Sequence, residues 1–223
     1  MPDANRKHID NGFFISLEGA EGAGKSTQAK RLAELLESRG YDVHLTREPG
    51  GTPLGEELRR LLKHVPGDDA PCPEAELLLM AASRAQLVRQ VILPFLHRGG
   101  IVVCDRFADS TTVYQGYVRN LDSACIESLH ELATAGRWPD ITLLLDVDTE
   151  AGLQRTRVRA ETGQRTDRFE REPYDFHRRV REGFLKLAEA HRDRIRVVAA
   201  EQSEEDVHKR IAETVLSVLE QLQ

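Results

Sequence analysis

The chain has 223 residues, 40% of them hydrophobic and 30% charged, and a formal net charge of −6 at pH 7. This length and composition indicate a soluble globular protein with one well-buried core rather than a disordered chain. The net negative charge disfavours a nucleic acid polymer as the main partner, because such binding normally rests on a basic surface. Any anion that binds here is therefore expected to be small and held locally.

The sequence carries no pattern for export or for a membrane. Residues 1–11 are polar and are predicted to form a loose tail, without the apolar centre of a signal peptide. No run of about 18 apolar residues could span a bilayer. Cys72, Cys104 and Cys125 are odd in number and lack CxxC spacing, which fits a reducing compartment better than a disulfide framework or a zinc site. We therefore expect a cytoplasmic protein with no membrane partner.

Short apolar segments rich in β-branched residues alternate with longer amphipathic segments, a pattern typical of a parallel sheet with helices on both faces. The predicted strands are Phe13–Leu17, Asp42–Thr46, Ile101–Cys104, Ile141–Asp146 and Ile195–Ala199. The predicted helices are Lys25–Ser38, Leu54–His64, Glu74–His97, Asp122–Ala135, Thr149–Glu161, Tyr174–Arg192 and Glu204–Leu222. Residues 12–223 are thus expected to form a single three-layer α/β domain around a five-stranded parallel sheet.

The segment GAEGAGKST matches the P-loop pattern and lies between a predicted strand and a predicted helix. Its glycines let backbone N–H groups surround phosphate, and the helix adds its positive dipole end. Lys25 is expected to reach the β- and γ-phosphates, and the hydroxyl of Ser26 to bind Mg²⁺. The alternative is a glycine-rich turn with an exposed lysine. The predicted nucleotide-binding residues are Gly19, Ala20, Glu21, Gly22, Ala23, Gly24, Lys25, Ser26 and Thr27.

Two further strands end in charged residues. Asp105 follows the apolar segment IVVC, where a carboxylate can hold Mg²⁺ beside a P-loop, and Arg106 comes next. The alternative is an aspartate that caps the strand end and pairs with its neighbouring arginine. Arg47 comes at the end of another predicted strand, so it too is expected at the ligand-binding edge of the sheet. The loop after it, EPGG, could otherwise be a plain turn.

The segment RTRVRAETGQRTDRFERE contains six arginines, five of them from Arg155 to Arg168. It is either a solvated charged helix end or a mobile cationic lid at about residues 155–170. The sequence lacks the Asn-Lys-x-Asp and Asp-x-x-Gly motifs of guanine nucleotide switches, and this favours a small-molecule kinase. A nucleotide-binding switch that is not a kinase stays open as the less favoured alternative.

Taken together, these motifs resemble the bacterial thymidylate kinases. The segments TREPGGTPLGEELRRLL, ASRAQLVRQVILPFL, VVCDRFADSTTVYQG and PDITLLLDV occur in the order and spacing of that family, over Phe13 to Leu222. The resemblance implies a P-loop NTPase-type fold and transfer of the γ-phosphoryl group of ATP to dTMP, with Mg²⁺, giving dTDP and ADP. It also implies a homodimer. Another P-loop nucleoside or nucleotide kinase is the alternative within the same class.

The resemblance also implies a site for dTMP. Arg47 and Arg106 match the clamp on its phosphate, and Arg84 matches the contact to the thymine edge, although taken alone it could be a surface arginine. The other positions that match substrate contacts lie near the sugar or the base: Glu21 at the 3′-hydroxyl, Tyr114 at the 2′ position, Thr111 and Gln115 at the base, and Met80 close to where many members carry a stacking aromatic.

The catalytic arginine is expected in the lid. Gly22 lies where other members carry a P-loop arginine, and members without it use a lid arginine to stabilise the transferring group. Arg159 and Arg165 are the first candidates, followed by Arg155. The i to i+4 spacing of Arg155 and Arg159 predicts a shared helix face, with Arg157 turned away. The predicted catalytic residues are Lys25, Asp105, Arg155, Arg159 and Arg165, and the predicted magnesium ligands are Ser26 and Asp105.

Overall fold

A parallel β-sheet in the order β2-β3-β1-β4-β5 forms the centre of the computed structural model, which describes residues 6–64, 70–163 and 166–222. Its strands are β1 (Phe13–Glu18), β2 (Val43–Arg47), β3 (Ile101–Asp105), β4 (Ile141–Asp146) and β5 (Ile195–Ala199). All residues of β1 are buried, as expected for the central strand of a sheet that is covered on both faces.

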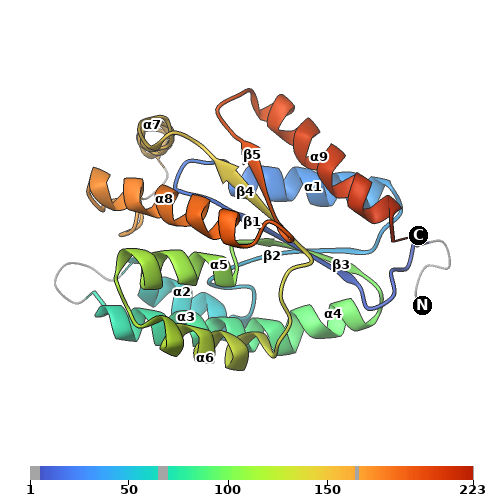
Figure 1. Ribbon diagram of the computed structural model, residues 1–223, viewed down its shortest axis with the longest axis horizontal. Helices are drawn as coiled ribbons and strands as arrows, with labels where there is room; N and C mark the ends of the chain where they lie inside the picture. The colour runs from blue at the N-terminus through green and yellow to red at the C-terminus, as the bar shows by residue number, and fades with distance from the viewer. Residues whose placement is uncertain (1–5, 65–69, 164–165, 223) are drawn as a thin grey trace.

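Helices cover both faces of the sheet, with α1 and α9 on one face and the α3, α4, α5 and α8 group on the other (Figure 1). The helices are α1 (Lys25–Ser38), α2 (Pro53–His64), α3 (Pro73–Leu87), α4 (Leu93–His97), α5 (Ala108–Thr111), α6 (Ser123–Thr134), α7 (Thr149–Glu161), α8 (Tyr174–Ala190) and α9 (Glu204–Glu220). Two π-helical segments, Val88–Ile92 and Thr112–Val118, continue α3 into α4 and extend α5. No helix in the described part of the chain is long and apolar enough to cross a membrane.

The alternation of side chains along β1 divides the core between the two faces. Ile15 and Leu17 belong to the cluster formed with α1 and α9, whereas Phe14 packs with α3, α4 and Phe107. The rings of Phe14 and Phe107 meet edge to face with centroids 4.8 Å apart. Successive residues of one strand therefore hold both helical layers, which follows from the two-residue period of a strand.

The predicted fold class is confirmed, and the five predicted strands agree with the observed ones within one residue at each end. The segment 108–118 was not predicted as helical, because its serine, threonine, valine and glycine residues are poor helix formers. Glu18 at the end of β1 compensates for the low helix propensity of this segment. Its Oε1 accepts hydrogen bonds from the backbone N–H groups of Phe107 and Ser110, so a side chain from another element caps the helix.

The predicted loose tail is wrong for the residues of it that the structure describes. Lys7 forms a parallel bridge with Tyr41 and donates its N–H to the carbonyl of Gly40 at 2.8 Å. Ile9 is 8% exposed and donates its N–H to the carbonyl of Gly99. The apolar Ile9 side chain in a polar segment is the feature that fixes this part of the chain. Residues 1–5 of the predicted tail lie outside the described residues.

A buried ion pair fastens α5 to the sheet. The carboxylate of Asp109 accepts hydrogen bonds at 2.7 Å from both terminal nitrogens of Arg194, which precedes β5. It also accepts from the hydroxyl of Thr142 on β4, and Thr142 in turn contacts Ser16 on β1. Asp109 is 1% exposed, so its charge depends on Arg194 for compensation.

We expect Asp109→Asn to lower the free energy of unfolding by about 3 kcal/mol, because it leaves the Arg194 guanidinium partly buried without its counter-charge. Urea denaturation monitored by circular dichroism measures this loss. Glu182→Gln is the matched control, since Glu182 pairs with Arg178 on the exposed side of α8, where an ion pair contributes little to stability. Equal losses in the two variants would contradict the assignment.

Candidate active site

The loop between β1 and α1 is closed around the ammonium group of Lys25. Gly19, Gly22 and Gly24 have φ angles of 143°, 74° and 89°, a region in which other residues are strained. Lys25 is 7% exposed and donates to the carbonyl of Ala20 at 2.7 Å. Burial and the nearby guanidinium of Arg106 lower the pKa of Lys25 to about 8. The loop thus concentrates positive charge where an anion can enter.

Ser26 and Asp105 bring two oxygen ligands together at the edge of this loop. The Ser26 hydroxyl donates a hydrogen bond to the Asp105 carboxylate, although the two residues are far apart in sequence. Mg²⁺ usually binds one or two protein oxygens and completes its coordination with water and phosphate. A hydroxyl and a carboxylate beside a phosphate loop fit that pattern, so these residues can hold Mg²⁺ together with a bound nucleotide.

The P-loop packs closely against α7. A Cβ atom added at Gly22 would lie 2.0 Å from the carbonyl oxygen of Gly152, and one added at Gly152 would lie 2.6 Å from the carbonyl oxygen of Glu21. Gly22 also has positive φ. A side chain at residue 22 would therefore displace the backbone of α7.

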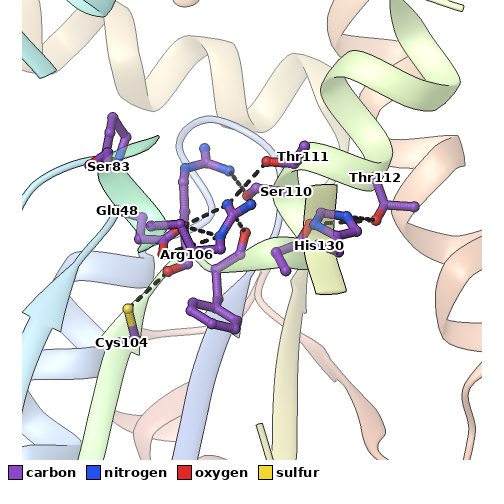
Figure 2. A network of polar contacts seen from close by, with 12 residues as sticks. Glu48, Ser83, Cys104, Arg106, Ser110, Thr111, Thr112 and His130 are labelled. Atoms are coloured by element: carbon purple, nitrogen blue, oxygen red, sulfur yellow. Dashed lines mark hydrogen bonds and ion pairs between the residues drawn. The ribbon is translucent and has the colours of Figure 1, made fainter. Parts of the chain in front are cut away.

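Arg106 connects the P-loop to the segment after β3, and Figure 2 shows its guanidinium beside Ser110. Its Nη2 donates to Glu21 Oε1 at 2.6 Å, and its Nη1 donates to the carbonyl of Gly19 and to Ser110 Oγ. Ser110 Oγ donates to Glu18 Oε2 at 2.6 Å. Arg106 itself adopts a φ of 69°. Fixed contacts on both sides thus orient the guanidinium.

Two carboxylates near Arg106 respond oppositely to their surroundings. Burial and Asp109 raise the pKa of Glu18 to about 7, against the opposing effect of Arg106. Burial acts on Glu21 in the same direction, but Arg106, Lys25 and Lys63 together hold the pKa of Glu21 well below its usual range. Glu21 therefore carries a negative charge at neutral pH.

Arg47 lies across the same edge of the sheet. The strand register pairs Arg47 of β2 with Asp105 of β3, which in turn pairs with Leu17 of β1. The Nη2 of Arg47 donates to both carboxylate oxygens of Glu56 at 3.0 and 3.1 Å, and the Arg47 side chain is 51% exposed. A groove of about 860 Å³ runs past Arg47, the P-loop and Asp105 to α7.

Beside this groove lies a cavity in which Arg84 is buried. Arg84 is 2% exposed, and its Nε and Nη2 donate to the Glu48 carboxylate at 2.6 to 3.2 Å. Nη2 also donates to Thr111 Oγ1 and to the carbonyl of Phe107. Nη1 is buried without a hydrogen-bond partner in the described part of the chain. The interpretation of Arg84 as a surface arginine is wrong, because three of the cavity's polar groups hold it inside.

The other predicted substrate residues line the same cavity: Met80, Arg106, Thr111, Tyr114, Gln115 and Glu21. The Tyr114 hydroxyl donates to Glu21 Oε1 at 3.2 Å, and its ring meets Phe169 edge to face. The Gln115 amide nitrogen donates to Glu76 Oε1 at 2.5 Å. The structure thus brings the predicted substrate residues together, except Arg47, which lies on the adjoining groove.

The lid arginines have different surroundings. Arg155 and Arg159 line the groove, where Arg155 donates to the carbonyls of Gly22 and Ala200, and Arg159 pairs with Glu170. Arg157 pairs instead with Glu150 at 3.7 Å, and both side chains are 62% exposed. Arg165 lies outside the described residues.

The C-terminal end of the segment predicted as a lid is anchored to α2 and α3. Arg168 donates from Nε to the carbonyl of Leu62 and from Nη2 to Glu76 Oε2. Asp167 pairs with Lys63 at 2.7 Å. Arg168 therefore supports the cavity wall through its contacts with α2 and α3.

Glu18, Glu48 and Glu76 are site residues that the sequence interpretation missed. Glu18 ends β1 and Glu48 follows β2, and each is at most 5% exposed. A carboxylate at the end of a predicted strand is the signal that applied to Asp105, and it could have identified both. Glu76, in the first turn of α3, had no such signal, because acidic residues are common at helix N-termini.

Known proteins with similar sequence and structure identify the family. The family model of thymidylate kinase matches residues 17–211. The thymidylate kinase of Maridesulfovibrio salexigens is 47% identical over 92% of this chain and 95% of its own length. That of Syntrophotalea carbinolica is 49% identical over 93% of this chain and 96% of its own.

The solved structures agree. The crystal structure of thymidylate kinase from Ehrlichia chaffeensis is 34% identical in sequence and superposes with a TM-score of 0.74, covering 92% of this chain and 98% of that one. The P-loop, the Asp105–Arg106 pair and the buried arginine cavity therefore lie in a fold shared with enzymes of that name, and the chain belongs to the thymidylate kinase family.

Proposed function

We propose that the protein transfers the γ-phosphoryl group of ATP to dTMP, giving ADP and dTDP, as a step toward dTTP. The buried Nη1 of Arg84 is the observation that carries the choice of base. An unpartnered buried donor costs about 1 to 3 kcal/mol, which a ligand acceptor would recover. The 4-oxo group of thymine is such an acceptor, whereas cytosine has an amino donor at that position.

The two substrates would bind on the two sides of Arg106. The backbone N–H groups of the P-loop and Lys25 suit the phosphates of ATP, and Arg47 and Arg106 suit the phosphate of dTMP. Glu21 of the P-loop and Tyr114 contact each other in the lining of the cavity, where the sugar would fit. Thr111 and Gln115, with Met80 on the wall, would contact the base.

In the reaction, a phosphate oxygen of dTMP attacks the γ-phosphorus of ATP, and the bond from that phosphorus to the β–γ bridging oxygen breaks. The attacking oxygen is already anionic at neutral pH, so the side chains need to supply alignment and positive charge rather than a general base. Mg²⁺, held by Ser26 and Asp105 with the nucleotide, would neutralise phosphate charge. Arg155, Arg159 and Arg165 are the candidates for stabilising the transferring group.

We further propose a cytoplasmic homodimer. The described cysteines Cys72, Cys104 and Cys125 are all free thiols, which suits a reducing compartment. Leu78 on α3 and Leu132 on α6 are 57% and 67% exposed on helices that contact each other, and they supply apolar area for a symmetric interface.

The acceptor is tested by a panel of nucleotides with ATP and Mg²⁺. We expect dTMP to be phosphorylated with a kcat/KM at least about a hundredfold above those of dCMP, dGMP and AMP, since a buried polar site rejects a ligand that leaves its groups unpaired. Coupled measurement of ADP release gives the rates. A preference for another acceptor, or nucleotide binding without transfer, would favour a different nucleotide kinase or a switch.

Lys25→Ala should lower kcat by about a hundredfold or more, because its ammonium group would stabilise the negative charge that develops on the phosphate. The melting temperature should stay near that of the unchanged protein. Lys30→Ala is the matched control, as Lys30 lies on the same helix and pairs with Glu34 on the exposed side. Near-normal turnover of the Lys25 variant would contradict the P-loop assignment.

Arg155→Ala, Arg159→Ala and Arg165→Ala should include at least one variant whose kcat falls much more than its KM rises. The reason is that a catalytic arginine stabilises the transition state more than the bound substrates. Arg157→Ala is the control, because Arg157 is exposed and pairs away from the groove. Steady-state kinetics with dTMP separates kcat from KM. Equal, small effects across all four would leave the segment a solvated charged surface.

A further inference from the structure

The two carboxylate oxygens of Glu76 contact different parts of the protein: a residue that lines the base cavity, and the C-terminal end of the segment predicted as a lid. The Glu76 side chain is 1% exposed. Oε1 accepts from the amide nitrogen of Gln115 at 2.5 Å, and Oε2 accepts from Arg168 Nη2 at 2.5 Å. Arg119 also approaches Oε2, at 3.7 Å. The positive groups thus lie on one oxygen and the neutral amide on the other.

This arrangement selects one of the two orientations of the Gln115 amide. An amide has a donating nitrogen end and an accepting oxygen end of nearly the same shape. A carboxylate only accepts, so Glu76 takes the nitrogen end and leaves Oε1 of Gln115 for the cavity. Gln115 is 1% exposed and lines the cavity together with Arg84.

We propose that Glu76 is a positioning residue for base selection, because it fixes Gln115 with its oxygen presented as an acceptor for the N3–H group of a 4-oxo pyrimidine. The proposal rests on the dTMP kinase function proposed above and deepens it. Thymine and uracil carry a hydrogen at N3, whereas N3 of cytosine is an acceptor and would meet Oε1 of Gln115 as a second lone pair. Arg84 and Gln115 then form a donor and acceptor pair that only the 4-oxo base matches.

Arg168 determines how the site responds when Glu76 becomes an amide. Arg168 can only donate, so in Glu76→Gln the new carbonyl oxygen faces Arg168 and the new NH₂ group faces Gln115. Gln115 must then turn its oxygen toward residue 76 and present its own nitrogen to the cavity. The variant therefore changes an acceptor into a donor without changing the size of either side chain.

The test compares the dissociation constants of dTMP, dUMP and dCMP, measured by titration calorimetry on the full chain. In Glu76→Gln we expect those of dTMP and dUMP to rise at least about tenfold, because both carry N3–H and lose their acceptor. The dissociation constant of dCMP should fall or stay unchanged. Kinetics with dTMP should show a raised KM with a smaller change in kcat, because the phosphate-binding residues are untouched.

Two further variants make the test specific. Glu74→Gln is the matched control, since Glu74 lies in the same first turn of α3 but is exposed, and it should leave all three constants unchanged. The exchanged pair Glu76→Gln with Gln115→Glu keeps the total charge and restores an acceptor at position 115. It should recover dTMP binding to within about threefold of the unchanged protein, and it replaces the single variant in the assay if that one does not fold.

An equal loss for all three nucleotides, or an unchanged dTMP constant, in Glu76→Gln overturns the proposal and leaves Glu76 a structural residue. Failure of the exchanged pair to recover the dTMP preference overturns it as well. The unchanged protein separates this inference from the proposed function. If it does not prefer dTMP, the function fails; if it does and the Glu76 variants keep the preference, only the role of Glu76 fails.

Discussion

The ion pair between Arg106 and Glu21 is the contact on which the geometry of the site depends. Arg106 belongs to the segment after β3, and Glu21 to the P-loop, so their contact at 2.6 Å ties these two segments together. Arg106 and Lys25 are both largely buried, and buried charges persist only when compensated. Arg106, Lys25 and Lys63 hold the pKa of Glu21 well below its usual range, so Glu21 supplies the counter-charge that keeps Arg106 in place between the two segments. Such preorganisation is what phosphoryl transfer requires of a protein.

The tight packing of the P-loop on α7 limits where a catalytic arginine can come from. Gly22 and Gly152 lie so close that neither accepts a Cβ atom without movement of the other backbone. An arginine at residue 22 would need α7 in another position. The same contact brings α7 against the phosphate loop, so that Arg155 donates to the carbonyl of Gly22. The absence of a side chain at residue 22 and the presence of arginines on α7 are thus two aspects of one packing arrangement.

Much of the fold and part of the site could be predicted from the sequence, because local patterns encode them. The apolar strand segments, the P-loop and the charged residues at the strand ends can each be identified from short stretches of sequence. Parallel strands bring their carboxyl ends to the same edge of the sheet, so these charged residues are expected to lie near one another. The helical segment 108–118 could not be predicted, since its stability comes from a distant carboxylate, Glu18, rather than from its own residues. Ile9 shows the same limit, because its burial depends on contacts with the distant Gly99 region.

Of the carboxylates around the site, only Glu76 carried no sequence signal, since Glu21 lies in the P-loop motif and Glu48 follows a predicted strand. Together they explain how a protein of net charge −6 can bind two polyanions. Three side chains that line the cavity are each held by a carboxylate: Glu48 holds Arg84, Glu76 holds Gln115, and Glu21 holds Arg106. These carboxylates orient the side chains that they bind. The compensation is incomplete around Lys25, whose pKa burial and Arg106 lower to about 8. A phosphate bound beside Lys25 would add negative charge and favour the charged ammonium form, which would contribute to the affinity for ATP.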